Sequence, residues 1–412
     1  MDTHISYTAK ELVEHFFRHS YGKMVSMLVA YFGLAEVEKA EDIAQDTLVE
    51  AVQKWSVRGI PENPEGWLMD VAKKKMINLL RRDQLFQEKI SQKWLEALHT
   101  ETDTTDSSLR MIFACCHPDL AAASQIALSL KILCGLSVAE IAGSLLTSEE
   151  NIQKRLYRAK KKFRDGEIPW GIPAEEDESR LSTVLKVLYL LFNEGYFSIR
   201  QKEHIRLDLC YESMRLLKQV LIAFPSLAEG KALMALMYLS VARFESRVTP
   251  LGELVLLKDQ DRSSWDQELI GEGLQFLSEA TETEQMSVYH LQAGITAEHC
   301  MAKDIVSTNW ESIHFQYELL NALQPSPIVQ LNSTIALFYL GKKEEALVEL
   351  DHLTHDPYLS QQALFFLTKG MLNQLAEKSE KARAMFNQAL ELSSSEAERE
   401  MITRSIDQAL ST

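Results

Sequence analysis

Apolar residues recur along the chain with the spacing expected of helices. From Glu41 to Trp55 they return every three to four positions, and the same spacing reappears from 67 to 82 and from 149 to 164. Long stretches after residue 180 follow the same rule. Only 16 Gly and 10 Pro interrupt 412 residues, while Leu, Ala, Glu and Lys are abundant. We therefore predict an all-α protein.

The first two patterned segments are predicted to be amphipathic helices, joined by a loop that contains Pro61 and Pro64. The first should bury Ile43, Ala44, Thr47, Leu48, Ala51, Val52 and Trp55. Its opposite, polar face carries Asp42, Gln45, Asp46, Glu50 and Gln53. The second, from Trp67, should bury Leu68, Val71, Ala72, Met76 and Leu79. Its basic residues Lys73, Lys74, Lys75, Arg81 and Arg82 should then face outward.

Residues 135–164 have the pattern of a helix-turn-helix. Ser137 with Glu140, and Thr147 with Glu150, form two predicted capping boxes, each of which starts a helix. The second helix should bury the stripe Ile152, Leu156, Ala159 and Phe163. Its outward residues are then Glu150, Asn151, Lys154, Arg155, Arg158, Lys161 and Lys162. Exposed Asn, Arg and Lys near a helix start suit base edges in the DNA major groove, and further cations suit phosphates.

Polar and Pro-rich stretches divide the chain. The segment TETDTTDSS has no apolar residue, and GEIPWGIPAEEDES is rich in Pro, Gly and acid. We expect a first domain at 1–85, a flexible linker at 86–107, a second domain at 108–166, a connector at 167–180 and a helical domain at 181–412.

The last third of the chain is repetitive. Two successive segments each have the pattern helix, turn, helix, with Ala382 and Phe386 at the Ala-x-x-x-Phe step of a tetratricopeptide repeat (TPR). Gly341 and Ala346 fall where such a repeat needs its turn and a small packing residue. We predict a TPR-like domain that binds a peptide or protein partner, with pure scaffolding as the alternative.

Charge is distributed unevenly. The chain has a formal net charge of -16, and almost all of it lies after residue 165. Residues 1–165 are close to neutral and contain two basic clusters, 73–82 and 154–164. Either cluster alone is equally well explained as a solvated helix face, but two together favour binding of a phosphate backbone.

These segments, in this order and spacing, resemble a bacterial extracytoplasmic-function (ECF) sigma factor. The resemblance rests on DIAQDTLVEAVQKW, PENPEGWLMDVAKKKMINLLRR and LSVAEIAGSLLTSEENIQKRLYRAKKKFR. RMIFACCHPDLAAASQIALSL, VLYLLFNEGY, LVLLKDQDRSSWDQELI and LQPSPIVQLNSTIAL extend it to the subgroup with a large C-terminal TPR-like extension. The resemblance implies binding to core RNA polymerase, through the β′ clamp helices and the β subunit, and binding to promoter DNA.

The resemblance also implies residue roles. The helix 42–55 is similar to sigma region 2.2, so the candidate core polymerase contacts are Asp42, Gln45, Asp46 and Glu50. The candidate contacts for the minus-ten element are Asn63, Trp67, Lys73, Lys74, Lys75, Asn78, Arg81 and Arg82, although Lys73, Lys74 and Asn78 depart from the common family pattern. The minus-thirty-five element would be read by Glu150, Asn151, Lys154, Arg155, Arg158, Lys161 and Lys162.

Other chemistry finds little support. No phosphate-binding loop, dinucleotide-binding glycines or hydrolase motif occurs, so we expect no enzyme, no catalytic residue and no cofactor. The five cysteines include no Cys-x-x-Cys pair, and Cys115-Cys116-His117 is a poor metal chelator, so we expect buried thiols and no metal. The acidic stretch DQDRSSWDQE is better explained as an ion-pair network or docking surface than as a calcium loop.

Two rival functions remain at this point. The chain could be a helix-turn-helix regulator with a TPR-like sensor that does not join the polymerase, or a helical scaffold with no DNA role. Neither accounts for both the acidic helix 42–55 and the basic helix 67–82. No run of about 18 apolar residues occurs, and the first residues lack the basic-then-apolar order of a signal peptide. We therefore expect a cytoplasmic protein that makes no contact with a membrane.

Overall fold

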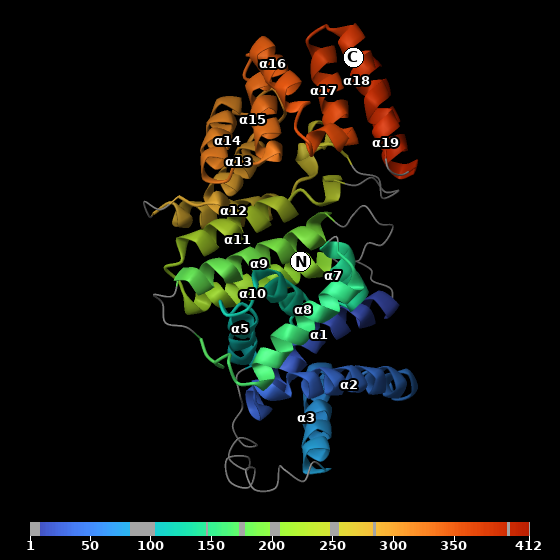
Figure 1. Cartoon of the computed structure of the whole chain (residues 1–412), viewed down its shortest axis with the longest axis vertical. Coiled ribbons are helices and arrows are strands. Elements are labelled where there is room, and N and C mark those ends of the chain that lie inside the picture. The colour runs from blue at the N-terminus through green and yellow to red at the C-terminus, as the bar shows by residue number, and fades with distance from the viewer. Residues whose placement is uncertain are drawn as a thin grey trace. The chain divides into compact units, whose positions relative to one another are not determined.

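The structure is a computed structural model that describes residues 9–82, 104–145, 147–172, 178–197, 207–247, 255–282, 286–393 and 396–411. Every regular element within these ranges is a helix, as the spacing of apolar residues predicts (Figure 1). The described residues form two compact units, one up to Pro225 and one from Ser226 onward.

Three helices open the first unit, and α1 (Ala9–Phe32) packs against both α2 (Val37–Arg58) and α3 (Pro64–Arg82). Gly33, at φ 97°, ends α1, and a short 3-10 turn, η1 (Leu34–Glu36), leads into α2. The predicted α2 stripe is buried at Ile43, Ala44, Thr47 and Ala51 and half-buried at Leu48 and Trp55.

Two details of the predicted stripes are wrong. Val52 is 47% exposed, because it lies at the edge of the stripe that Ala44, Leu48, Ala51 and Trp55 form. In α3 the residues Leu68, Ala72 and Met76 are buried as expected, but the fourth deeply buried residue is Leu80 rather than Leu79. A spacing of four continues the row from Leu68 through Met76 to Leu80, and this row faces the core.

Four helices follow, namely α5 (Thr104–Cys115), α6 (Ala122–Ile132), α7 (Val138–Ser144) and α8 (Glu149–Arg164). The α7–α8 pair is the predicted helix-turn-helix, and α6 packs on both. The expected stripe of α8, Ile152, Leu156, Ala159 and Phe163, is buried. Our linker boundary at 107 lies too late, since α5 already begins at Thr104 and buries Ser107. Residues 86–103 lie outside the described residues.

The capping chemistry agrees with the sequence at α7 and differs at α8. Ser137 Oγ accepts from the Glu140 backbone N–H at 3.2 Å, and Glu140 Oε2 accepts from the Ser137 N–H at 2.7 Å. At α8 the N-cap is Ser148, whose Oγ accepts from the Asn151 N–H at 3.3 Å. Thr147, which we predicted as the cap, instead accepts a hydrogen bond from the Asn151 side chain.

The helices α9 (Glu178–Phe197) and α10 (Leu207–Ala223) belong to the first unit, although the sequence places them in the C-terminal domain. Arg180, expected in the connector, is buried in α9, and its Nη2 donates to the Phe113 carbonyl at 2.9 Å. The Phe113 ring also packs edge-on against Phe224 at 5.8 Å. An apolar and hydrogen-bonded contact with α5 therefore moves the division of the chain from residue 180 to Pro225.

Nine helices make up the described part of the second unit, and each packs on its neighbours in the chain. They are α11 (Ala228–Val241), α12 (Gln267–Ala280), α13 (Val288–Met301), α14 (Trp310–Leu323), α15 (Pro327–Tyr339), α16 (Lys343–Leu353), α17 (Ala363–Leu375), α18 (Ser379–Leu392) and α19 (Glu396–Ser411). Packing between sequence neighbours is typical of solenoids built from helix pairs.

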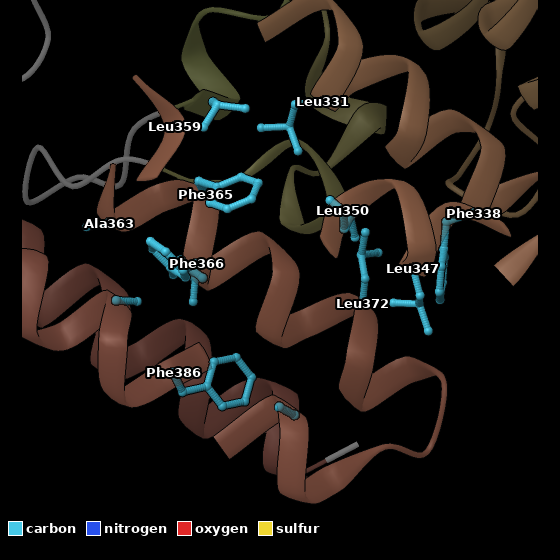
Figure 2. Close-up of a cluster of buried hydrophobic side chains, with 14 of the residues drawn as sticks. Leu331, Phe338, Leu347, Leu350, Leu359, Ala363, Phe365, Phe366, Leu372 and Phe386 are labelled. Carbon is cyan, nitrogen blue, oxygen red and sulfur yellow. The ribbon is translucent and has the colours of Figure 1, made fainter. Parts of the chain in front are cut away.

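The last helices of this unit share one apolar core. Figure 2 shows Phe338 of α15, Leu347 and Leu350 of α16, and the α17 and α18 phenylalanines gathered between the helices. Ala346 and Ala382 are fully buried, and Gly341 turns the chain after α15 at φ 101°. At Gly370 of α17 a Cβ atom would lie 2.5 Å from the Phe386 ring, so glycine lets α18 approach closely.

None of the helices in the described ranges combines the length and the apolarity that crossing a membrane requires.

Candidate polymerase and promoter interface

The outer face of α2 is acidic and exposed, as the sequence predicts. Asp42, Gln45 and Asp46 are exposed on it. Glu50 differs, because its carboxylate lies 2.6 Å from Lys54 Nζ and 2.9 Å from Lys75 Nζ. Hydrogen bonds from these two ammonium groups lower the pKa of Glu50. Three of the four candidate polymerase contacts are therefore available to a partner, and the fourth ties α2 to α3.

The basic residues of α3 do not form one uniform surface. Lys75 bonds to α2 through Glu50 and also donates to the Asp46 carbonyl at 2.9 Å. Lys73 lies with its ammonium 4.3 Å from the Tyr31 ring centroid. Lys74 and Asn78 are exposed. Arg81 and Arg82 end the helix, but their side chains lie outside the described residues.

The loop before α3 is built around Asn63 and Trp67. Asn63 Oδ1 accepts from the Gly66 backbone N–H at 2.9 Å, which caps the start of α3. Trp67 packs edge-on against Trp55 of α2 at 5.5 Å, and Lys54 Nζ lies 5.7 Å from its ring. Both Asn63 and Trp67 therefore position the loop, whatever they also contact in DNA.

The recognition helix α8 has an exposed, cationic outer face. Asn151, Arg158 and Lys161 are exposed, as the sequence predicts, whereas Arg155, which was also expected to face outward, is half-buried. Two further candidates already have partners. Lys154 Nζ lies 2.6 Å from Glu150, one turn earlier, and Lys162 Nζ donates to the Asp119 carbonyl at 3.0 Å.

Our sequence reasoning missed Tyr157, which is 60% exposed on the outer side of α8. The Arg164 guanidinium lies 5.8 Å from its ring. The signal in the sequence was its position, because Tyr157 follows Lys154 by about one helical turn and comes directly before Arg158.

A second face of α8 contacts α2. Lys160 Nζ lies 2.5 Å from Glu41 Oε2, and both side chains are largely buried. Arg164 Nη1 lies 2.6 Å from Glu38 Oε2 at a more exposed position. The hydroxyl of Tyr21 in α1 donates to the other Glu41 oxygen at 3.2 Å, and burial together with this carboxylate raises the pKa of Tyr21. These ion pairs join the two N-terminal helical modules, in addition to the packing of α1 on α5 and α6.

Comparisons with known families identify these modules. Residues 16–86 match the model of Sigma-70 region 2, and residues 110–163 match Sigma-70, region 4. The chain belongs to the sigma-70 family. It is a sigma factor of the ECF type with a C-terminal helical extension. Residues 180–281 match a further model, described as a family of unknown function (DUF6596).

One curated relative spans nearly the whole sigma factor. It is an uncharacterized protein of Rhizobium meliloti (strain 1021), 34% identical over 396 residues, and the match covers 92% of each chain. No solved structure matches.

Membership of this family settles the broad activity. A sigma factor binds core RNA polymerase and promoter DNA and takes part in transcription initiation, with the region 4 helix-turn-helix binding DNA. The family is not enzymatic. The structure adds that α2 and α8, the helices expected to contact polymerase and promoter, are linked through Glu41 and Lys160.

Proposed function

We propose that this sigma factor directs core RNA polymerase to a subset of promoters through α8 and α3, under the control of its C-terminal domain. The observation that carries the proposal is the outer face of α8. This face presents Asn151, Arg158 and Lys161 to solvent, while the opposite stripe is buried. Amide and guanidinium groups on one helix face can pair with base edges, and the remaining cations with phosphates.

Region 2 would make two different contacts. Asp42, Gln45 and Asp46 on α2 are proposed to bind cations of the β′ clamp helices. Lys74 and Asn78 on α3 are proposed to contact the minus-ten element. Glu50 and Lys75 join the two helices by an ion pair, so we assign them a positioning role rather than a direct contact.

Promoter binding would require the two sigma regions to separate. The minus-ten and minus-thirty-five elements are about 25 base pairs apart, which is about 85 Å of duplex at about 3.4 Å per pair. Region 2 and region 4 cannot reach both elements while Lys160 contacts Glu41 at 2.5 Å. We infer that the closed arrangement belongs to the free chain and that it opens on polymerase.

Binding of polymerase and opening would be coupled through α2. Glu38, Glu41 and Asp42 lie on the same helix, within about one turn of one another. Polymerase cations drawn to this helix would compete with Arg164 and Lys160 for its carboxylates. The free energy of core binding would thereby release α8 toward DNA.

The C-terminal domain is proposed to be TPR-like and regulatory. Helix pairs that pack on their chain neighbours, with Gly370 and Ala382 at close approaches, support the TPR-like assignment. Such pairs commonly bind peptides or partner proteins. The rival function, a regulator that binds operator DNA without polymerase, gives the acidic face of α2 no purpose.

The proposal is tested by mixing the purified chain with sigma-free core RNA polymerase and following co-elution in gel filtration. A second chain that ends after Pro225 keeps α9 and α10 on α5, which a cut near residue 170 would not. We expect both chains to co-elute with core, and the truncated chain to transcribe independently of any signal. Co-elution by neither chain would reject the sigma function, and equal transcription by both would reject control by the C-terminal domain.

A further inference from the structure

In the second unit two arginines flank one buried tryptophan. Arg243 follows α11, and Arg262 begins η6 (Arg262–Ser264) in the acidic stretch DQDRSSWDQE. Their guanidinium carbons lie 5.1 Å and 5.3 Å from the Trp265 ring centroid. Trp265 is 3% exposed, and its Nε1 donates to Ser246 Oγ at 2.7 Å. A fixed indole therefore sets the position of both cations.

The acids of this stretch do not neutralise the two arginines. Asp261 accepts from the Ser263 backbone N–H at 2.9 Å and caps η6. Asp266 accepts from backbone N–H groups at the start of α12. No ion pair joins either guanidinium to a described carboxylate. Within the described residues, Asp259 of this stretch pairs with Lys258, but the ion-pair network that the sequence suggests does not extend to the two arginines at Trp265.

Hydrogen bonds within the unit account for only part of the two guanidinium groups. Arg262 Nη1 donates to the His299 and Ala302 carbonyls, at 3.0 Å and 3.1 Å, and to Thr308 Oγ1 at 3.2 Å. These contacts cap the C-terminal end of α13. Arg262 Nη2 and Arg243 Nε are buried and donate to no described acceptor. Buried guanidinium N–H groups need an acceptor, and the described residues supply none for these two nitrogens.

A third unpartnered nitrogen belongs to His299, whose carbonyl accepts from Arg262. His299 is 7% exposed, its Nδ1 has no hydrogen-bond partner, and its ring packs edge-on against Trp310 at 5.5 Å. Burial and then the charges of Arg243 and Arg262 lower the pKa of His299 to about 3. The imidazole is therefore neutral at pH 7 and can donate one N–H.

We propose that Arg243, Arg262 and His299 bind an oxyanion, the carboxylate or phosphate group of a small molecule. The acid Asp304 attracts Arg262, and this attraction contributes to the lowered pKa of Asp304. A water molecule could accept the remaining hydrogen bonds but would not balance the second positive charge, that of Arg243. An oxyanion supplies both the acceptors and the charge, and guanidinium groups match its geometry. The bound group would join the end of α11, η6 and the end of α13.

This site goes beyond the sigma function, because it lies wholly in the second unit and can be tested without polymerase or DNA. The probes are inorganic phosphate, sulfate and acetate, added to the full chain at constant ionic strength with chloride as the reference. Thermal unfolding gives the shift in Tm, and titration calorimetry gives the affinity. A response to phosphate and sulfate would indicate a phosphate ligand, and a response to acetate would indicate a carboxylate ligand.

The decisive variant is Arg243→Gln, because Arg262 also caps α13. Its matched control is Lys258→Gln, which removes a cation from the same loop, where Lys258 pairs with the adjacent Asp259 at 3.0 Å. We expect a saturable rise in Tm with at least one probe, retained by Lys258→Gln. Arg243→Gln should weaken the affinity about ten-fold or more, as loss of a charged hydrogen bond implies.

The unliganded variants provide a second readout. Removal of the uncompensated cation should leave the Tm of anion-free Arg243→Gln equal to that of the parent chain or above it. A purely structural Arg243 would instead lower this Tm, because its contact with Trp265 is lost. The proposal is overturned if no probe raises the Tm saturably, or if Arg243→Gln responds to the probes as the parent chain does.

Discussion

Lys160 of α8 lies with its ammonium 2.5 Å from the carboxylate of Glu41 in α2, and both side chains are largely buried. One residue thus belongs to the promoter-reading helix and the other to the helix proposed to bind polymerase. Four residues further along α8, Arg164 repeats the contact with Glu38 at 2.6 Å. The free sigma factor therefore keeps its two DNA-binding regions together, and we propose that its activity depends on breaking these pairs.

Removal of the buried cation should open the first unit. Lys160→Gln leaves the buried Glu41 carboxylate with its hydrogen bond from Tyr21 but without its cation, and loss of a buried ion-pair partner typically costs about 3 kcal/mol. Arg164→Gln breaks a more exposed pair and should cost less than about 1 kcal/mol. Hydrogen exchange followed by mass spectrometry measures the protection of α2 and α8 in each variant. Equal protection in the two variants would show that the Lys160 pair does not hold the regions together.

The outer face of α8 should govern binding to the minus-thirty-five element. Arg158→Ala is expected to weaken binding to a duplex from the promoter of the sigma factor's own operon by about 1–3 kcal/mol if Arg158 contacts a base. Lys161→Ala should weaken all duplexes alike and reduce the salt dependence by about one charge. Fluorescence anisotropy at several salt concentrations separates the two. Lys186→Ala, an exposed cation of α9, is the control and should change neither quantity.

Polymerase binding should depend on the acidic face of α2. Asp42→Ala with Asp46→Ala removes two exposed carboxylates and should lower the affinity for core polymerase, with most of the change in the association rate. Each exposed charge contributes about 1 kcal/mol or less. Surface plasmon resonance at low and at physiological salt measures both rate constants. Glu62→Gln, in the exposed loop before α3, is the control and should bind core polymerase normally. An equal loss of affinity in this variant would show that binding does not depend specifically on the acidic face of α2.

Close packing in the C-terminal domain predicts opposite effects for two glycines. In Gly370→Ala the new Cβ meets the Phe386 ring at 2.5 Å, so the second unit should lose about 1–3 kcal/mol of stability. In Gly271→Ala the new Cβ of α12 meets nothing within 4 Å, and the helix should gain about 0.5–1 kcal/mol. Denaturant unfolding of the two variants gives the sign of each change. Two changes of the same sign would be inconsistent with this packing.

Acid should destabilise the second unit through His299. Its folded pKa of about 3 lies below its ordinary value of 6.5, so below pH 6.5 the unfolded state binds a proton that the folded state does not. The stability is present above pH 6.5, and about 2 kcal/mol of it is lost by pH 5. His299→Gln should remove this contribution between pH 7 and 5, measured by denaturant unfolding, and leave that of His290, whose pKa burial also lowers. His352→Gln, an exposed imidazole of α16, should retain it.

Sequence patterns could predict the features that arise within a single helix, namely its buried face and its start. The spacing of Ile152, Leu156, Ala159 and Phe163 identifies the buried side of α8, and Ser137 with Glu140 identifies the start of α7. These features are local, because helix periodicity and capping bonds act within about two turns. Thr147 and Ser148 are both suitable N-cap residues for α8, and the sequence-based prediction of Thr147 was wrong.

Contacts between distant segments could not be predicted in this way. Lys160 lies in a basic run and Glu41 at the edge of an acidic face, and nothing in either pattern pairs them. The same holds for Arg180, which the sequence leaves in a connector and the structure buries against Phe113. Tertiary packing decides which charged side chains are buried, so it also decides which members of the basic clusters remain available for DNA.

Run-off transcription tests the central claim most directly. The full chain and the chain that ends after Pro225 are each mixed with sigma-free core RNA polymerase and the promoter of the sigma factor's own operon. The account predicts a specific transcript that requires the added chain and that decreases with the Asp42→Ala, Asp46→Ala variant or with a mutated minus-thirty-five element. Failure of both chains to produce a transcript or to bind core, while they still bind duplex DNA, would contradict it.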